Sequence, residues 1–248
     1  MDTLTNSLDL QKVAIMSVDE KLLLIRNYDL WAHISDEEYE ELNIIHNFIE
    51  AEKGDYLYFE AHLHNRIYFL KEGYIKIGHI DTAGNEIVKE ILQKGELFGQ
   101  ITLERNNMMG EFALAHKSNV SLCSFTIEDF RTLLKKKPEL AFKYTQQVGT
   151  KLKRVESRLL NLLSKDIRSR LINFFANLVL TQVKSPLPTE IRIPNFFTHE
   201  DIAQLVGSTR QTVTTMLTQL SQEEILHFSR KEIWVPDVKK LQNMMTVG

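Results

Sequence analysis

The sequence has one cysteine and no long apolar run, and each shortage excludes a class of protein; with only five prolines, no segment is of low complexity. The lone Cys123 excludes an intrachain disulfide framework and an iron–sulfur cluster held by four cysteines of one chain. The longest apolar runs, such as residues 22–25 and 174–176, are too short to span a bilayer. The chain begins without the basic and apolar stretches of a secretory signal, so we expect a cytoplasmic protein with no membrane partner.

The composition is sufficient for two globular domains. Hydrophobic residues make up 43% of 248 residues, which is enough to bury a core. The net charge of −3 is uneven, because residues 165–248 carry ten Lys/Arg and eight Asp/Glu, a net +2, and the first 164 residues carry −5. A mildly basic C-terminal third permits one DNA-facing end.

Residues 48–125 alternate short β-type runs with turn signals. The runs are 56–59, 66–70, 74–77 and 120–123, and the stretch Asp81-Thr82-Ala83-Gly84-Asn85 joins two runs as a hairpin turn does. Many short strands at this spacing predict a small barrel or jelly roll. The residues before this region are expected to be mostly helical, and they suggest no role.

A helix with an apolar stripe is predicted from Pro138 to Leu163. The stripe consists of Ala141, Tyr144, Val148, Leu152, Val155, Leu159 and Leu162. Its repeat is close to 3.5 residues over about three heptads, a width that suits one partner helix. We therefore expect a dimerisation helix; the alternative is an amphipathic helix lying on its own domain.

The strongest signal lies in residues 198–217, which predict a helix-turn-helix. Thr198 and Asp201 resemble a capping box at the start of a first helix, which has Ile202, Ala203 and Val206 on its apolar face. Gly207 supplies the left-handed conformation of the turn.

A second helix is expected after this turn. Ser208 and Gln211 open it by the same capping logic, and its inward face comprises Val213, Leu217 and Leu220. Two short helices joined in this way are typical of major-groove binding.

The outward face of this second helix carries residues that suit base edges and phosphates. They are Ser208, Thr209, Arg210, Gln211, Thr214, Thr215 and Thr218. Arg can bond a guanine bidentately, Gln an adenine, and Thr a base, a thymine methyl or a phosphate. The hairpin predicted over residues 225–235 has Arg230 and Lys231 at its turn, where a wing meets phosphates.

These segments resemble the cyclic-AMP receptor protein/FNR (Crp/Fnr) family from about Phe48 onwards. The matching stretches are Lys53-Gly54-Asp55, residues 67–76, residues 94–99 (Lys-Gly-Glu-Leu-Phe-Gly) and residues 165–171. The resemblance implies an α+β chain with a cyclic-nucleotide-binding-like β-roll (jelly roll) at 1–137, a dimerisation helix at 138–163 and a winged helix-turn-helix at 164–248. It also implies a homodimer on a two-fold-symmetric operator, with base-reading positions at Arg210, Gln211 and Thr215. In cyclic-AMP-responsive members the third of these is an arginine, so a different half-site is expected. The resemblance allows RNA polymerase as a partner, although the sequence points to no patch for it.

The β-roll departs from the family pattern of cyclic-AMP binders. Those members have a Glu after the glycine that matches Gly99, for the ribose, and an Arg-Ser pair eleven and twelve residues past that glycine, for the phosphate. Gln100, Gly110 and Glu111 stand there instead. A carboxylate repels a phosphate, so control by cyclic AMP is not expected. The candidate effector pocket is Phe98, Gly99, Gln100, Gly110, Glu111 and Phe112, with Met108 and Met109 beside it.

Other ligands stay open, and no cofactor is expected. Haem has candidate ligands in His79, His116 and Cys123, while an apolar small molecule, a protein partner or no effector fit equally well. A cupin-like metal enzyme is the remote alternative, because His62 and His64 resemble a cupin pair. The carboxylate that cupins place four or five residues later is missing, so neither a metal nor catalysis is expected. A module whose helix-turn-helix docks a protein is disfavoured, since Arg210 and Gln211 would have no use there.

Overall fold

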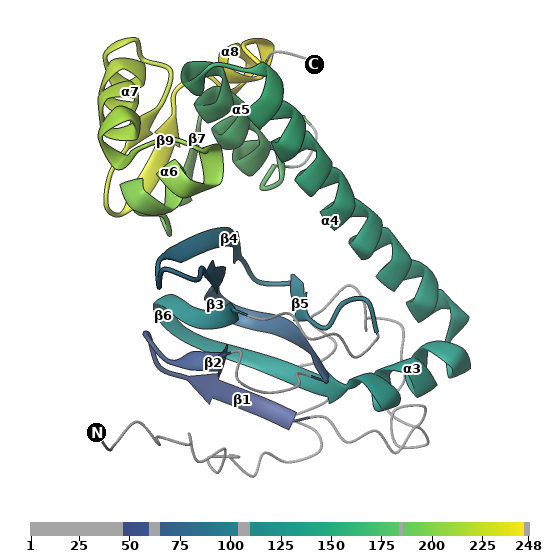
Figure 1. The fold of residues 1–248 in the computed structure, drawn as a ribbon. Helices are drawn as coiled ribbons and strands as arrows, with labels where there is room; N and C mark the ends of the chain where they lie inside the picture. Colours follow the sequence, from purple (N-terminus) through teal and green to yellow (C-terminus); the bar gives the residue numbers. More distant parts are fainter. Residues whose placement is uncertain (1–46, 60–64, 104–109, 184–185, 246–248) are drawn as a thin grey trace, which may run out of the picture. The chain divides into compact units, whose positions relative to one another are not determined.

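The computed structural model of the chain describes residues 47–59, 65–103, 110–183 and 186–245 (Figure 1). The chain forms two compact units, which meet along the sequence at residues 148 and 149, except that segment 87–89 groups with the second unit. The first is β-rich and the second mainly helical, so the predicted α+β class is confirmed. Within the described ranges no helix is long and apolar enough to cross a membrane.

The first unit is a β-roll that leads into helices. Its elements are β1 (Asn47–Ala51), β2 (Tyr56–Phe59), β3 (Arg66–Ile80), β4 (Glu86–Leu92), β5 (Leu97–Gly99), β6 (Glu111–Thr126), α3 (Ile127–Lys136) and the start of α4 (Pro138–Ser164). The sheet has the order β1-β6-β3-β4, with β2 also paired to β6 and β5 to β3. The hairpin turn at 81–85 is confirmed, because Asp81 Oδ1 accepts hydrogen bonds from the amides of Ala83 and Asn85.

The two predicted runs 66–70 and 74–77 are one strand, β3, so their separation was wrong. β3 pairs antiparallel with β6 along most of its length and passes through register shifts around Glu72. Gly73 has φ +85°, and an added Cβ would lie 2.4 Å from the Asn119 carbonyl oxygen. A glycine that marks a turn in the sequence therefore marks a bulge within a long strand.

Strand alternation divides the core of this unit between two faces. Ile67, Phe69 and Phe125 pack with Phe130 of α3 and with Tyr144 of α4. The residues between them in sequence pack inside the roll, where Tyr68, Leu70 and Leu122 belong to the second cluster. The expected helix over the first residues, His62, His64, Met108 and Met109 lie outside the described residues.

The second unit is a winged helix-turn-helix. After the rest of α4 come α5 (Ile167–Leu180), β7 (Ile191–Pro194), α6 (His199–Val206), α7 (Arg210–Gln222), β8 (His227–Phe228), β9 (Glu232–Val235) and α8 (Val238–Asn243). The strands form a small sheet of order β7-β9-β8. Asp166 caps α5 by accepting a 2.7 Å hydrogen bond from the Ser169 amide. Buried Phe175, Ile202 and Val213 come from three different helices, which fixes α6 and α7 on a common core.

Candidate DNA-binding interface and sensor pocket

The turn between α6 and α7 forms by local capping at both ends of α6. Thr198 Oγ1 accepts from the Asp201 amide, and the Asp201 carboxylate accepts from the Thr198 amide at 2.8 Å, which confirms the predicted capping box. Gly207 has φ +64°, the predicted left-handed conformation, and its amide bonds carbonyls at the end of α6. The left-handed conformation strains any residue but glycine, and an added Cβ would also lie 2.6 Å from Leu162 Cδ2, whose side chain would have to shift.

Helix α7 begins one residue later than expected. Its N-cap is Thr209, which accepts from the Thr212 amide at 3.2 Å, so the prediction of Ser208 and Gln211 as the cap was wrong. Thr209 and Thr212 also share a hydrogen bond between their hydroxyls at 2.9 Å. Thr209 stands three residues before the amide that donates to it, so it satisfies the same capping rule one residue later.

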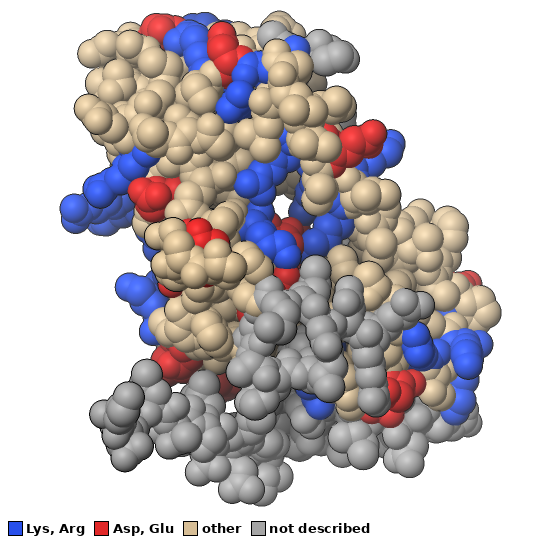
Figure 2. All heavy atoms as spheres, viewed as in Figure 1, with Lys and Arg blue, Asp and Glu red and all other residues tan. Residues whose placement is uncertain are grey.

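The two faces of α7 have opposite characters. Val213, Leu217 and Leu220 are buried, as predicted, whereas the predicted reading residues Arg210, Gln211, Thr214, Thr215 and Thr218 are all exposed. Arg210 is the only charged residue of the helix. The surface over α7 that faces the viewer in Figure 2 is accordingly almost uncharged.

The three exposed threonines point their hydroxyl protons at the helix backbone. Thr214, Thr215 and Thr218 each donate to the carbonyl four residues earlier, at 2.9, 3.2 and 3.0 Å. With the proton committed, each oxygen is left to accept, and the amino groups of adenine and cytosine are donors at a base edge.

His199 connects the two helices with the wing, a link that the sequence reasoning missed. Its Nδ1 lies 2.8 Å from Thr214 Oγ1, and its ring lies 5.2 Å from the ring of Phe228. Because the Thr214 hydroxyl donates to the Arg210 carbonyl, the histidine nitrogen is the donor in this pair. Burial and then the positive charge of Arg210 lower the pKa of His199 from its ordinary value of 6.5. Sequence offered no signal for this contact beyond the position of His199 beside the Thr198 cap.

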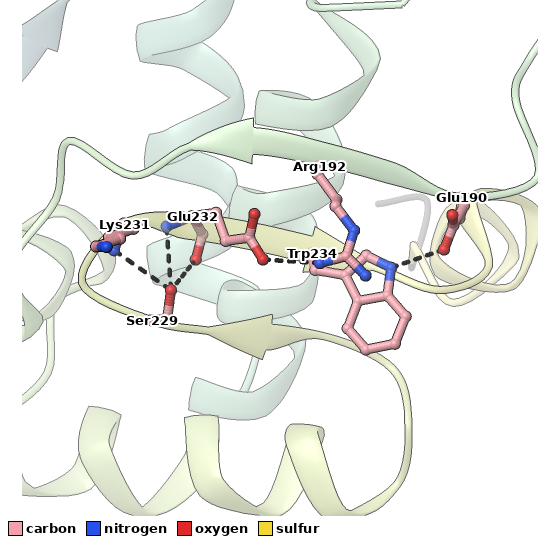
Figure 3. A network of polar contacts seen from close by, with 6 residues as sticks. All are labelled: Glu190, Arg192, Ser229, Lys231, Glu232 and Trp234. Carbon is pink, nitrogen blue, oxygen red and sulfur yellow. Dashed lines mark hydrogen bonds and ion pairs between the residues drawn. The ribbon is translucent and has the colours of Figure 1, made fainter.

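The predicted wing is confirmed as the β8–β9 hairpin, with exposed Arg230 and Lys231 at its turn. Figure 2 shows basic side chains extending from this part of the unit. The third strand, β7, was missed, although Ile191 and Ile193 alternate with polar residues. Figure 3 shows the polar contacts that follow the sheet from the turn to its far end.

Helix α4 is confirmed, and its predicted stripe has three different environments. Tyr144 is 8% exposed, packs on Phe130 and donates a hydrogen bond to the Ile101 carbonyl of its own β-roll. Ala141 and Val148 are half-buried beside it, and Leu162 lies against Gly207. Only the middle of the stripe is open.

The open part contains Leu152, Val155 and Leu159, at 67%, 60% and 54% exposed. Leu163, which is 75% exposed, lies on the same side of the helix. These four residues are called the α4 seam below. Since Tyr144 is buried in its own unit, it is not a contact for a partner helix.

The candidate sensor pocket is only partly assembled. Tyr58 stacks near Phe98 at 6.4 Å between ring centroids and donates a 2.8 Å hydrogen bond to Glu111. Burial, together with the Glu111 charge, raises the pKa of Tyr58 well above 10. Phe112 is fully buried, and strand alternation directs it to the opposite face of β6 from Glu111.

The remaining residues of the predicted pocket have roles in backbone conformation and backbone hydrogen bonding. Gly99 and Gly110 both have positive φ, and Gly110 lies against His79 so closely that a Cβ would be 2.5 Å from its ring. Gln100 is 5% exposed, and its backbone amide donates a hydrogen bond to the Arg66 carbonyl at 2.9 Å. Glycine conformation therefore explains two positions without any ligand.

Two of the three candidate haem ligands, Cys123 and His116, are buried. Cys123 is buried in the cluster that packs on Phe130 of α3, where burial raises the pKa of its thiol to about 12 and leaves it a poor metal ligand. His116 is 8% exposed and pairs with Tyr74 across β3 and β6. In the part of the chain that the structure describes, no three His, Cys, Asp or Glu side chains are grouped to hold a metal ion.

Two family models match the two units. Residues 48–137 match the cyclic nucleotide-binding domain, and residues 169–244 match the Crp-like helix-turn-helix domain. A sensor-type β-roll followed by this DNA-binding domain defines a class of bacterial transcription regulators.

Comparison of whole chains identifies the family. The chain is 30% identical over 192 residues to the global nitrogen regulator of a Synechocystis species, covering 77% of this chain and 84% of that one. It is 23% identical over 169 residues to the cAMP-activated global transcriptional regulator CRP of Haemophilus influenzae, covering 68% and 75%. The chain belongs to the Crp/Fnr family of DNA-binding transcription regulators.

Solved structures agree in fold. A CooA mutant from Carboxydothermus hydrogenoformans has a TM-score of 0.70 at 21% identity, covering 91% of this chain and 99% of that one. FixK2 from Bradyrhizobium japonicum has a TM-score of 0.68 at 18% identity, covering 83% and 100%. At these identities the likeness concerns the fold alone.

Proposed function

We propose that the chain acts as a homodimer that reads a two-fold-symmetric operator with one α7 helix in each half-site, and that it does so without cyclic AMP. The observation that carries this proposal is the division of α7, whose apolar face is fully buried while every predicted reading residue is exposed. A helix held in this way by α6 suits the major groove.

Each exposed residue has a role that its chemistry supports. Arg210, in the first turn of α7, bonds a guanine, and Gln211 bonds an adenine. Thr214, Thr215 and Thr218 offer hydroxyl oxygens and methyl groups to the bases. Ser208, Thr209, Arg230 and Lys231 contact phosphates on either side, which positions the helix without reading sequence.

The α4 seam joins the two copies. Its residues fall at steps of three and four, the spacing of a two-helix coiled coil, and they expose large apolar side chains that a partner helix would cover. Pairing through this helix places the two α7 helices for adjacent turns of DNA. The DNA-binding domain then extends from the end of α4, near residue 164, to residue 248, and the sensor precedes the helix at residues 1–137.

The sensor does not use cyclic AMP in this proposal, although several relatives are named for it. Glu111 is hydrogen-bonded to the half-buried Tyr58, and a carboxylate at this point opposes a cyclic phosphate. Haem or an apolar small molecule stays as an alternative effector. The protein is then a cytoplasmic, non-enzymatic regulator, with RNA polymerase as a further partner where it activates.

The test is selection of bound duplexes from a random DNA pool by the purified full-length chain without added ligand. Recovery of a two-fold-symmetric site that is unchanged by cyclic AMP supports the proposal. An asymmetric site contradicts the dimer, and recovery only in the presence of cyclic AMP contradicts the effector argument. Arg210→Ala serves as the comparison variant, because its selected site loses one specified position in each half.

A further inference from the structure

The turn of the wing has little support from strand pairing. β8 is two residues long, and only His227 and Phe228 pair with β9. Beyond them lie Ser229, Arg230 and Lys231, which include neither a proline to fix φ nor a glycine to take a positive φ. Something other than the ladder must hold this turn if its basic side chains are to meet a phosphate in one geometry.

Ser229 supplies the first part of that support. Its hydroxyl oxygen accepts from the amides of Lys231 and Glu232 at 3.3 and 3.0 Å, and its proton goes to the Glu232 carbonyl at 2.9 Å. The Ser229 amide also donates to this carbonyl, at 3.0 Å. One side chain thus closes the turn on itself, and Figure 3 shows its contacts at the end of the sheet.

Asn195 supplies the second part, from outside the hairpin. Its Nδ2 donates to the Ser229 carbonyl at 2.6 Å, and its backbone amide donates to the Lys231 carbonyl at 2.9 Å. Its Oδ1 accepts from the Phe197 amide at 2.8 Å, and Phe197 is 4% exposed. Asn195 therefore ties the wing turn to the anchored segment that leads into α6.

The acidic residue next to the turn, Glu232, is held in an ion pair. Glu232 follows Lys231 directly, and a free carboxylate there would repel DNA. Arg192 pairs with it at 2.8 Å and lies 4.5 Å over the ring of Trp234, which in turn donates to Glu190 at 2.9 Å. Figure 3 shows the Glu232 carboxylate directed along the sheet toward Arg192 and away from Lys231.

We propose that Asn195 and Ser229 are positioning residues that preorganise the wing turn, so that Arg230 and Lys231 bind phosphate without a prior ordering step. The inference rests on the proposed function and adds two residues that contact no base. A turn ordered in the free protein loses little conformational entropy on binding, and this raises affinity for every DNA sequence equally.

The test measures affinity for the selected operator and for an unrelated duplex by fluorescence anisotropy, using the full-length chain. Ser229→Ala and Asn195→Ala are each expected to weaken both duplexes about five- to tenfold, the effect of one or two lost hydrogen bonds, with unchanged base preference. Ser229→Thr keeps the hydroxyl and should restore wild-type affinity. Thr181→Ala, which removes a hydroxyl bonded to the Leu178 carbonyl in the same unit, is the matched control and should change nothing.

A double-mutant cycle separates positioning from general damage to the fold. When Arg230 and Lys231 are both replaced by Ala, adding Ser229→Ala or Asn195→Ala should weaken binding no further. An equal loss in that background overturns the inference, as does wild-type affinity of the two single variants. If the unmodified chain retains no duplex, the proposed function fails; amide exchange at Glu232 then still tests the turn, since the variants must accelerate it.

Discussion

The proposed pairing through the α4 seam can be tested with a matched control, because Leu159 lies in the seam and the adjacent Leu160 does not. Leu159 and Leu160 are 54% and 55% exposed, so replacing either with Glu changes the isolated chain to the same extent. Their directions around the helix differ by about 100°. Leu159 lies in the seam with Leu152 and Val155, whereas Leu160 does not.

The expected effect follows from the exposed fraction. Complete burial of a leucine side chain is worth about 2 kcal/mol, so covering the open half of Leu159 contributes about 1 kcal/mol per copy. A two-fold-symmetric dimer doubles this to about 2 kcal/mol, and two carboxylates facing each other across the seam add about 1 kcal/mol of repulsion. Leu159→Glu should therefore raise the dimer Kd about 100-fold.

Sedimentation equilibrium over a range of protein concentrations measures this Kd, and circular dichroism verifies that both variants are folded. Leu160→Glu should dissociate like the wild type. The Leu159→Glu monomer should also lose most of its operator affinity, since each copy then holds one half-site. Equal dissociation of the two variants, or a stable Leu159→Glu dimer, would refute the seam as the interface.

Three further predictions concern the winged helix. Arg210→Ala should cost about 1–3 kcal/mol of operator affinity and relax one base position per half-site; selection with the variant checks this, and uniform weakening of all sequences would make Arg210 a phosphate contact instead. Gly207→Ala should destabilise the unit by about 1–2 kcal/mol, because alanine is strained at φ +64°, and urea unfolding followed by circular dichroism measures the loss. Burial and Arg210 lower the pKa of His199, so near pH 6 the folded chain binds fewer protons than the unfolded chain. The contribution of His199 to the free energy of unfolding is therefore complete above its unfolded pKa of about 6.5 and declines as the pH falls below that value. His199→Gln should make the free energy of unfolding change less with pH, as measured by denaturant titrations at several pH values. An unchanged pH dependence would contradict the assignment.

The parts of the fold that depend on local chemistry could be read from the sequence. The Thr198–Asp201 capping box and the Gly207 turn are set by neighbours a few residues apart, and both formed as predicted. The apolar positions Val213, Leu217 and Leu220 follow from helical periodicity alone.

The parts that depend on distant partners could not be read in this way. β7 ends at Pro194 and is four residues long, and it is a strand because β9, about forty residues later, pairs with it. The contact of Asn195 with Ser229 spans 34 residues and leaves no local signature. The stripe of α4 is continuous in sequence, yet Tyr144 is buried because Phe130 of α3 packs against its ring.

The candidate sensor pocket shows a related difficulty. Gly110, Glu111 and Phe112 are consecutive, and counting positions against a family pattern treats them as one site. The strand separates them: Glu111 faces Tyr58 on one side of β6, while Phe112 is buried on the other. Identifying an effector therefore requires the pairing of β2 with β6, which residue spacing does not contain.

The distribution of charge on the winged helix assigns affinity and specificity to different elements. The whole chain carries −3, and α7 carries Arg210 as its only charge, so long-range attraction to DNA is small and this helix releases few of the counterions condensed on the DNA. Neutral threonine and glutamine side chains discriminate between bases but contribute little net binding energy, because water satisfies them equally well in the free protein. Affinity must then depend on a few phosphate contacts of good geometry. Asn195 and Ser229 touch no base, yet by holding the turn that carries Arg230 and Lys231 they support these phosphate contacts.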